Sequence, residues 1–238
     1  MARYGLAEHV FVCRDEEYVV VLDLKRDRYF ALEAGRTAAL TPLLPGWPAP
    51  SPQGPGALPD AAVDEAAAPL LRQGWLLEES AASKDAAPVQ FPQPETELVG
   101  DTDTVGAKLG IRIVVAFLAA SIFAKLALRL RRFEHVVRRV AERNAAHARS
   151  GRQLDIERAR QLVDAFGRMR VFLFSSREEC LHDSLAVLEF LARYEIFPRW
   201  VFGVRARPFA AHCWVQHAGI VFNDSVEHAS TYTPIMVV

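Results

Sequence analysis

Cysteine is scarce in this sequence, and its scarcity excludes two kinds of protein. Only three cysteines occur among 238 residues, Cys13, Cys180 and Cys213. An odd and sparse set of this kind is not the disulfide framework of a secreted protein, so a reducing compartment is indicated. No two cysteines have the Cys-x-x-Cys spacing of a zinc site. The sequence therefore predicts no metal centre.

An excess of charge and a membrane-spanning run are missing as well. The net charge is −1, which gives no overall field toward nucleic acid, and the basic stretch at 129–160 is interpreted as a solvated helix face. The apolar segment 111–130 contains Arg112 and Lys125, which leave twelve uncharged residues between them. Because a membrane span needs about 20, the segment is interpreted as a buried or interfacial helix. The first residues lack the apolar core of a signal peptide, so a cytoplasmic protein is expected.

What remains is an ordinary globular composition with a visible boundary. Hydrophobic residues make up 51% of the chain and charged residues 24%, as in folded soluble domains. A length of 238 residues allows two modest cores. Residues 80–103 are rich in Ala, Pro, Ser and acids and poor in large apolar side chains, which is typical of a linker. We therefore predict domains at 1–80 and 105–238, joined by a linker at 81–104.

The first part has the pattern of an antiparallel meander followed by helices. Three short runs are rich in β-branched and aromatic residues: His9–Cys13, Tyr18–Leu24 and Arg28–Leu32. The charged triplets between these runs have the size of hairpin turns. Helical spacing follows at 34–44 and 60–73, and a loop rich in proline and glycine separates the two helices.

The last part changes from a helical period to a strand period. Helices are predicted at about 105–147, 155–166 and 178–194, and strands at 171–174, 199–204, 211–216 and 220–223. Helices followed by antiparallel strands indicate an α+β domain.

Cys180 stands where a helix start would activate a thiol. Ser176 and Glu179 have the spacing of a capping box, directly before the predicted helix to Tyr194. Cys180 then falls in the first turn, where free backbone N–H groups and the helix dipole favour a sulfur anion and would later face an oxyanion. Glu178 and Glu179 oppose this effect, so a further cation must help. The alternative is a buried thiol that only packs as a small hydrophobic residue.

His212 and Asp224 are predicted to face each other across a hairpin. Residues 217–219 are interpreted as a three-residue turn with Gly in the left-handed position. This turn sets Gln216 opposite Ile220. The same register places His212 opposite Asp224 with Cβ atoms about 4.5 to 5.5 Å apart, so the carboxylate would orient the imidazole toward the thiol. A four-residue turn would shift the register by one residue and leave Asp224 offset.

Cys213 and the other histidines are weaker candidates. Successive strand residues point to opposite faces, so Cys213 is separated from His212 and is a poor nucleophile for this base. His182 would point to a different side of its helix, His217 lies in the turn, and His228 follows the last strand. The remaining histidines lie in segments with no other chemistry: His9, His135 and His147.

A cysteine at a helix start, followed by a histidine and an aspartate on strands, resembles the papain-like and transglutaminase-like cysteine enzymes. The sequence is more closely similar to the B2 leader peptidases of lasso-peptide biosynthesis. The resemblance covers about 172–232 and is carried by Ser176-Arg177-Glu178-Glu179-Cys180-Leu181, Phe202-Gly203-Val204, Pro208-Phe209-Ala210-Ala211-His212-Cys213-Trp214-Val215 and Asn223-Asp224. One departure is Cys213, where the family more often has a small residue such as alanine. No functional consequence is expected from it.

The resemblance implies an α+β fold with two parts. Residues 1–80 are similar to a winged-helix-like RiPP recognition element, and 105–238 to a papain/transglutaminase-like cysteine protease domain, as in lasso-peptide biosynthesis B proteins. A short meander with an open edge can accept an extended peptide as an added strand, beside a helix that supplies pockets. The expected leader-binding residues are Arg28, Tyr29, Phe30, Ala31 and Leu32, with 61–73 as the neighbouring helix. An ordinary half-buried strand and core helix is the alternative.

The resemblance also implies an activity and partners. The first part would bind the leader of a precursor peptide, and the second would cleave it from the core peptide with Cys180, His212 and Asp224. The freed core would pass to an asparagine-synthetase-like lasso cyclase. Family members need ATP for leader removal, yet the chain lacks Gly-x-x-x-x-Gly-Lys-Ser/Thr, so ATP is expected to act through the partner and no directly bound cofactor is expected.

Other functions stay open at this point. An amine acyltransferase would use the same three residues and give the acyl group to an amine instead of water. A non-enzymatic scaffold would only bind the precursor. Nucleic-acid binding by the basic stretch is a third reading, which salt-dependent binding of random DNA would test.

Overall fold

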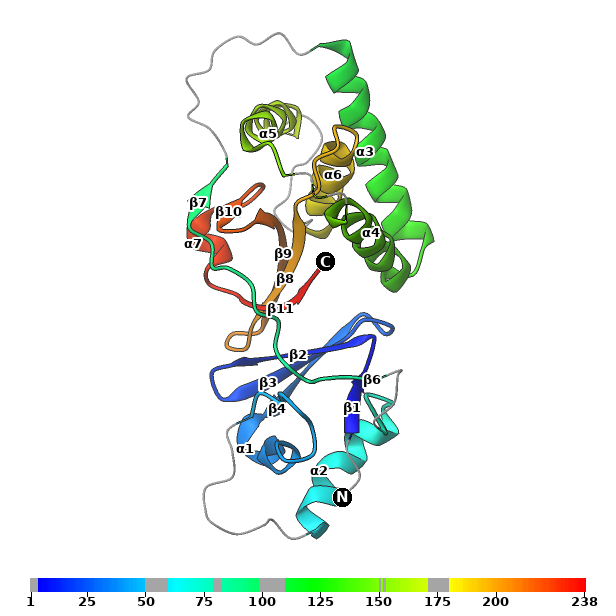
Figure 1. Ribbon diagram of the computed structural model, residues 1–238, viewed down its shortest axis with the longest axis vertical. Helices are drawn as coiled ribbons and strands as arrows, with labels where there is room; N and C mark the ends of the chain where they lie inside the picture. The colour runs from blue at the N-terminus through cyan, green and yellow to red at the C-terminus, as the bar shows by residue number, and fades with distance from the viewer. Residues whose placement is uncertain are drawn as a thin grey trace. The chain divides into compact units, whose positions relative to one another are not determined.

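The structure is a computed structural model, and the backbone forms two compact units. It describes residues 4–49, 60–78, 83–98, 110–149, 151, 153–170 and 180–238, and the side chains of all these except 60–64. The first unit comprises Met1–Gln90, Val204–Ala210 and Thr233–Met236; the second comprises Phe91–Gly203, Ala211–Tyr232 and Val237–Val238. Figure 1 shows the helices and strands of both units.

The first unit contains the predicted meander. Strands β2 (Val10–Asp15), β3 (Tyr18–Asp23) and β4 (Arg28–Glu33) pair antiparallel in the order β2-β3-β4. The turns between them contain Glu16 and Asp27, each with a φ of 52°. The predicted meander is confirmed. It could be predicted because runs of β-branched residues and short charged turns determine strands and hairpins from neighbouring residues alone.

The rest of the first unit differs in part from the expectation. Helix α2 (Asp60–Arg72) continues through Pro69, whereas the segment predicted as one helix at 34–44 forms only α1 (Ala34–Thr37) and the 3-10 turn η1 (Ala38–Leu40). A second sheet, which was not predicted, has the order β5-β1-β6. Its strands are β1 (Tyr4–Ala7), β5 (Leu76–Glu78) and β6 (Ser83–Lys84).

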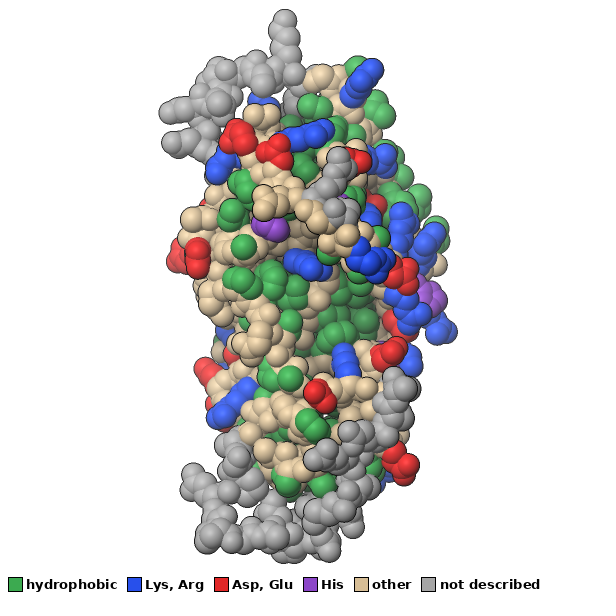
Figure 2. Space-filling view, in the orientation of Figure 1, with side chains coloured by type: hydrophobic (Ala, Val, Ile, Leu, Met, Phe, Trp, Pro, Cys, Tyr) green, Lys and Arg blue, Asp and Glu red, His purple; other side chains and the backbone are tan. Residues whose placement is uncertain are grey.

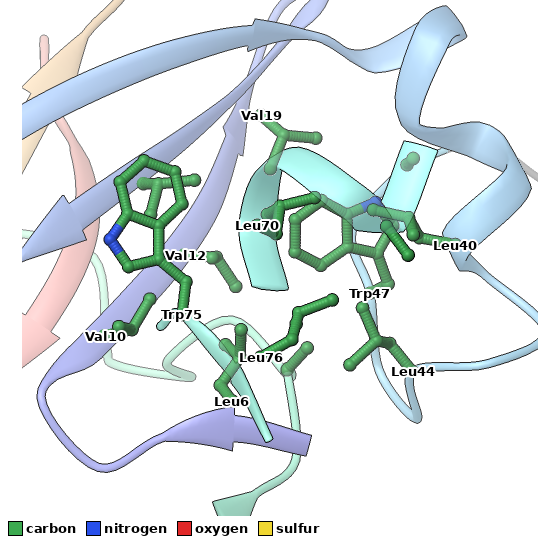
Figure 3. Close-up of a cluster of buried hydrophobic side chains, with 14 of the residues drawn as sticks. Leu6, Val10, Val12, Val19, Leu40, Leu44, Trp47, Leu70, Trp75 and Leu76 are labelled. Carbon is green, nitrogen blue, oxygen red and sulfur yellow. The ribbon is translucent and has the colours of Figure 1, made fainter. Parts of the chain in front are cut away.

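A hydrophobic core joins the elements of the first unit. Figure 3 shows side chains from the meander, β1, β5, η1 and α2 pointing toward one another. Two tryptophans, Trp47 and Trp75, are the largest members, and Phe30 of β4 packs on Trp75 with ring centroids 4.7 Å apart. The Trp75 indole donates a 2.9 Å hydrogen bond to the buried Asp23 carboxylate. Burial of these apolar side chains stabilises the unit, and the aromatic rings contribute the largest buried areas per residue.

The second unit is mixed helix and sheet, in agreement with the α+β prediction. Its helices are α3 (Ile111–Leu130), α4 (Phe133–Ala148), α5 (Ile156–Arg170), α6 (Cys180–Ala192) and α7 (Val226–Ala229). Most residues of a five-stranded sheet also belong to this unit. The sheet has the order β11-β8-β9-β10-β7, with β7 (Thr96–Glu97), β8 (Arg199–Arg205), β9 (Ala210–His217), β10 (Ile220–Val221) and β11 (Thr233–Val237). The strand predicted at 171–174 lies outside the described residues.

Helix α6 is the buried centre of the helical layer. Figure 1 shows it between α3 and α5, and both helices pack against it. Leu185, Leu188 and Leu191 are fully buried, and Phe190 contacts Phe166 of α5 with ring centroids 5.5 Å apart. A helix that is apolar on nearly all sides is stable only inside a core. Its burial gives Cys180, its first described residue, a rigid support.

The segment predicted as a linker at 81–104 contributes strands to two of the three sheets. Ser83–Lys84 pairs with β1, and Thr96–Glu97 pairs parallel with β10. Ala86 and Leu98 are fully buried. Few apolar residues are present, as the composition indicated, but these two are placed inside the protein. The composition of the segment carried no signal of this pairing.

Helix α3 is the only helix of the described residues that is long and apolar enough to cross a membrane. A single such helix is weak evidence of a span, because core helices meet the same criteria. Only 28% of its most apolar window is buried in the protein.

Candidate active site

Cys180 is half-buried at the beginning of the described part of α6. The capping box predicted at Ser176 and Glu179 lies outside the described residues. The Ser184 hydroxyl, one turn later, donates a 2.7 Å hydrogen bond to the Cys180 carbonyl oxygen. The backbone that carries the sulfur is therefore held by the first turns of a buried helix.

His212 of β9 lies between the other two predicted site residues. Its Nε2 is 2.5 Å from the Asp224 Oδ2, and both side chains are mostly buried, with 14% and 15% exposed. His212 also forms a hydrogen bond with the Cys180 sulfur. Because Nε2 is engaged by the carboxylate, Nδ1 is the ring nitrogen available to the thiol. The structure thus brings Cys180, His212 and Asp224 together.

The hairpin that was expected to pair His212 with Asp224 has a different register. Residue Ile220 pairs with His217, and Val221 pairs with Gln216, whereas Gln216 was predicted to face Ile220. The turn is therefore two residues long, and its left-handed residue is Ala218, with a φ of 51°. The prediction of a three-residue turn with glycine in that position was wrong. The sequence pattern favoured glycine, but the twist of the hairpin selects the first turn position.

Asp224 reaches His212 because the chain leaves the ladder just before it. The last ladder bond runs from the Phe222 N–H to the Val215 carbonyl oxygen, 2.9 Å. The next residue, Asn223, accepts the Val215 N–H through its side chain at 2.8 Å. This side-chain bond replaces one rung of the sheet and turns the chain toward the histidine. The pair is therefore made by an asparagine-capped strand end and not by cross-strand register.

The surroundings of Cys180 favour a thiolate. Its pKa is lowered from 9.0 to about 4. The largest cause is a hydrogen bond from the Cys213 side chain, and burial of the thiol opposes it by raising the pKa. A hydrogen bond from His212, the positive charge of His212, and the backbone N–H of Cys213 lower it further. Hydrogen bonds to a charged form and an opposite charge nearby both stabilise that form. At neutral pH the Cys180 side chain is therefore a thiolate, the form in which a cysteine is nucleophilic.

The imidazole of His212 carries the matching positive charge. Burial alone would lower its pKa. Hydrogen bonds with Asp224 and Cys180, together with the negative charges of both, instead raise it from 6.5 to about 9. The pKa of Asp224 is in turn lowered: burial opposes this, but the His212 hydrogen bond and charge outweigh it. Between about pH 4 and pH 9 the site is a thiolate–imidazolium pair backed by a carboxylate.

Comparison with known families agrees with this arrangement. Residues 120–237 match the family model of the Transglutaminase-like superfamily. This part of the chain is a transglutaminase-like domain. The domain includes all three residues of the site. No curated protein and no solved structure matches the chain. A transglutaminase-like domain is consistent with cysteine peptidase or acyltransferase activity.

Cys213 has a place in the transglutaminase-like domain that sequence reasoning did not assign. It was expected to lie on the opposite face of the strand without functional consequence. Its side chain is buried and 3.3 Å from the Ser184 hydroxyl, which accepts a 2.9 Å hydrogen bond from the Trp200 indole. The Cys180 sulfur accepts a hydrogen bond from the Cys213 backbone N–H. The sulfur therefore lies next to the backbone of β9, and the Cys213 side chain also forms a hydrogen bond with it. Alternation alone therefore did not separate Cys213 from the site.

Only one of the two neighbouring thiols is ionised. The pKa of Cys213 is raised well above 9.0, first by complete burial and then by the hydrogen bond and negative charge of Cys180. It therefore stays a thiol and donates to the Cys180 thiolate. The expectation that Cys213 is a poor nucleophile agrees with this pKa.

His228 is a second imidazole on the Asp224 carboxylate. Its Nδ1 is 3.1 Å from both carboxylate oxygens, and its ring centroid is 4.5 Å from that of His212. The Ser225 N–H also donates to Asp224, at 2.9 Å. The i, i+4 spacing of Asp224 and His228 was a usable signal, since such residues share a face of a helical turn.

The same three side chains offer a set of metal-ligand atoms. Those of His212, Asp224 and His228 all lie within 4.8 Å of one another. Both imidazoles are already hydrogen-bonded to the carboxylate. A pKa of about 9 keeps the proton on His212 at neutral pH, and a metal ion would have to displace it. The chemistry of this set fits a hydrogen-bonded triad better than a metal centre.

Asp183 and Asn223 connect helix α6 to the strand end that carries Asp224. The Asn223 amide donates a 2.9 Å hydrogen bond to the Asp183 carboxylate, which also pairs with Arg170 at 2.9 Å. Burial raises the pKa of Asp183, partly offset by the charge of Arg170. This buried network joins the cysteine-bearing helix to the aspartate-bearing turn. It fixes their separation, which is what a catalytic triad requires.

Gly203 gives the domain room for the rings behind His212. A Cβ at this position would lie 2.8 Å from the Trp214 ring and 2.8 Å from the Cβ of Tyr232. Trp214 stacks on His212 with ring centroids 5.9 Å apart, and Tyr232 lies 5.1 Å from it. A side chain at 203 would push these rings toward the imidazole. The Phe202-Gly203-Val204 motif therefore has a packing reason as well as a family resemblance.

Proposed function

We propose that the protein is a cysteine peptidase that removes the leader from a lasso-peptide precursor before macrolactam formation. The observation that carries this proposal is the position of the His212 ring between the Asp224 carboxylate and the Cys180 sulfur. The transglutaminase-like domain supports the reaction class. The sequence resemblance to B2 leader peptidases supports the substrate.

The geometry suits acyl transfer through a thioester. The Cys180 sulfur attacks the scissile carbonyl carbon, and the C–N bond breaks as His212 gives its Nδ1 proton to the leaving amine. A water molecule then gives a proton to His212 while its oxygen displaces the sulfur, which releases the leader acid and restores the thiolate. Asp224 holds the ring and stabilises its positive charge throughout.

The first unit supplies a strand edge for a leader peptide. Among the described strands, β4 pairs only with β3, and we infer that a leader peptide adds as a strand at its outer edge. Arg28 and Ala31 are exposed on β4, and Tyr29 is half-buried. Phe30 and Leu32 are also half-buried but pack against the hydrophobic core of the unit. Of the five predicted leader-binding residues, Arg28, Tyr29 and Ala31 are therefore better placed to contact a leader than Phe30 and Leu32.

Two partners complete the proposal. The precursor leader binds the first unit, and the freed core amine passes to an asparagine-synthetase-like lasso cyclase. ATP acts through this cyclase, because the sequence has no glycine-rich phosphate loop. The expected cytoplasmic location agrees with a catalytic thiolate, because a reducing compartment keeps such a thiolate from being oxidised.

The decisive experiment incubates the full chain with a leader-bearing precursor, with and without the cyclase and ATP, and weighs the products by mass spectrometry. The wild type is expected to release leader and core as separate masses, and Cys180→Ala is expected to release neither. Cys13→Ala, which removes a cysteine outside the site, is the matched control and should cleave normally. Complete maturation by Cys180→Ala would instead indicate a scaffold without catalysis.

The same experiment separates hydrolysis from amine acyl transfer, the second reaction that a transglutaminase-like domain supports. An added primary amine would appear as extra mass on the leader-side product if the acyl group passes to an amine. The proposed peptidase gives the free acid.

Leader binding is tested on Cys180→Ala, which holds the substrate without cleaving it. Arg28→Glu and Tyr29→Ala are expected to weaken binding of a fluorescent leader peptide. The matched control is Arg14→Glu, an exposed charge on β2 at the other edge of the same meander. Equal loss in all three variants would contradict binding at β4.

A further inference from the structure

Helix α3 exposes a continuous ridge of large aliphatic side chains. Among the described residues, eight large hydrophobic side chains are exposed, and six of them belong to α3. These six, which we call the α3 ridge, are Ile111, Val115, Leu118, Ile122, Leu126 and Leu130, exposed by 75%, 57%, 42%, 59%, 50% and 77%. Their spacing of three or four residues keeps them on one face. At a rise of about 1.5 Å per residue, the ridge is about 30 Å long.

Folding of the second unit does not account for this ridge. The opposite face of α3 is the one that packs on α6 and α5, through Phe117 and the alanines at 120, 124 and 127. Small side chains there allow close helix contact. The helix is thus apolar on two faces, and only one face is used by the protein itself. A contiguous exposed apolar surface of this size marks an interaction site.

The charged residues of α3 itself are all positive. Segment 111–130 contains no aspartate or glutamate, and Arg112, Lys125 and Arg129 are exposed. At 3.6 residues per turn these three lie within about 75° of the centre of the ridge. Figure 2 shows hydrophobic and basic side chains side by side along the edge of the molecule that α3 forms in Figure 1. The occupant of the ridge must therefore be apolar and anionic.

These charges argue against a second copy of the chain. If two α3 helices pack antiparallel about their centres, Arg112 of one copy meets Arg129 of the other. In a parallel pair each cation meets its own equivalent. Either arrangement places like charges together at the edge of a dry interface, which is unfavourable. A self-associating ridge would need acidic residues that this helix does not have.

The composition of the ridge favours lipid over a folded partner. Protein interfaces obtain most of their binding energy from tryptophan, tyrosine and arginine anchors in fitted pockets, and leucine and valine are under-represented among them. The ridge contains only isoleucine, valine and leucine. A fluid hydrocarbon phase needs no shape complementarity, and anionic headgroups would meet the flanking cations.

We propose that the α3 ridge binds an anionic lipid surface, with α3 lying in the plane of the membrane. The aliphatic side chains would enter the boundary between headgroups and acyl chains, while Arg112, Lys125 and Arg129 stay at the level of the phosphates. The helix does not cross the bilayer, because its other face is held against α6. This inference is independent of the proposed peptidase activity.

The test is co-sedimentation of the full chain with phosphatidylcholine vesicles and with vesicles that contain about a quarter phosphatidylglycerol. The wild type is expected to bind the anionic vesicles at least about tenfold more tightly than the neutral ones, and less tightly as salt is raised. Ile122→Glu and the double variant Lys125→Glu/Arg129→Glu should each weaken this binding at least about tenfold. Leu71→Glu, an exposed leucine of α2, is the matched control and should bind as the wild type does.

Three results would overturn the proposal. The first is equal sedimentation of wild type and Ile122→Glu with anionic vesicles. The second is equal binding to both kinds of vesicle, which would remove the role of the cations. The third is absence of vesicle binding, and a dimer of the wild type that Ile122→Glu dissociates would then assign the ridge to a second copy. Unchanged circular dichroism and an unchanged alkylation rate of Cys180 verify that each variant is folded.

Discussion

Cys13 and Cys180 are the same kind of side chain in two regions that treat a thiol in opposite ways. Cys13 of β2 is fully buried, and its pKa is raised to about 12 by burial and by the negative charge of Asp15. Cys180 is half-buried, and its pKa is lowered to about 4 by donors from Cys213 and His212, although burial opposes this. Removal from water alone makes a thiol inert. Donors and a cation within the same partly dry space make it a nucleophile.

His212→Ala should have the largest effect on the difference in pKa between Cys180 and Cys13, because it removes the cation whose charge stabilises the Cys180 thiolate. We expect peptidase activity to fall by about 10⁴-fold or more. The pKa of Cys180 should move back toward that of an ordinary thiol. Ultraviolet titration of the thiolate and the rate of precursor cleavage measure the two effects. In the wild type, limited alkylation should label Cys180 and leave Cys13 unlabelled, and equal labelling would break the comparison.

The rate of cleavage should be nearly constant between two pH limits, which are set by the pKa of Cys180 and the pKa of His212. Below about pH 4 the Cys180 thiolate is protonated and the nucleophile is lost. Above about pH 9 His212 loses its proton and can no longer protonate the leaving amine. Activity should fall about tenfold for each pH unit beyond either limit. A profile that instead rises through the ordinary thiol pKa near 8.5 would contradict an ion pair in the free enzyme.

Asp224→Asn tests the support behind the imidazole. The amide preserves the shape of the side chain but removes the negative charge that raises the pKa of His212. We expect a loss of roughly 10² to 10⁴ in the rate of cleavage and an alkaline limit at lower pH. Asn223→Ala is the companion variant. It keeps all three site residues, and a similar loss there would show that the strand end itself positions the carboxylate.

Cys213→Ala should reduce, but not abolish, the difference between the pKa of Cys180 and the pKa of Cys13. The change removes the thiol donor that is the largest single cause of the lowered Cys180 pKa, but leaves His212 in place. Alkylation of Cys180 should slow several-fold at about pH 5 and stay nearly unchanged at about pH 8, because the thiolate population differs only near its pKa. Equal slowing at both values would indicate a packing defect instead of a lost hydrogen bond.

His228→Gln should have the smallest effect. A glutamine at 228 can still donate a hydrogen bond to the Asp224 carboxylate. In His228→Leu this hydrogen bond is lost. We expect a change of at most about fivefold for glutamine and a larger one for leucine, since a hydrogen bond to a charged group contributes about 1.5 to 3 kcal/mol. The alkaline limit of the pH profile is the readout, because a merely structural defect would lower the rate without moving it.

The N-terminal meander and the identity of the three site residues were accessible from local patterns. Charged turns, of two and four residues in the structure, delimit strands within a few positions, and the ladder of β2, β3 and β4 follows directly. The same reasoning failed at the Gln216–Ile220 hairpin, where the turn has two residues and Ala218 takes the left-handed conformation. The residues named as partners still meet, because Asn223 ends the ladder and redirects the chain.

The linear order of residues was enough to indicate the candidate site residues, the strands β2, β3 and β4 and the charges that interrupt the apolar run of α3, since these depend on spacing along one chain. The nearness of Cys213 to the Cys180 sulfur, the sharing of Asp224 by two imidazoles and the pairing of Thr96–Glu97 with β10 depend on segments far apart in sequence. Their positions follow from how buried side chains of α6 and the sheet pack. No local spacing encodes that packing, because each contact is decided by all its neighbours at once.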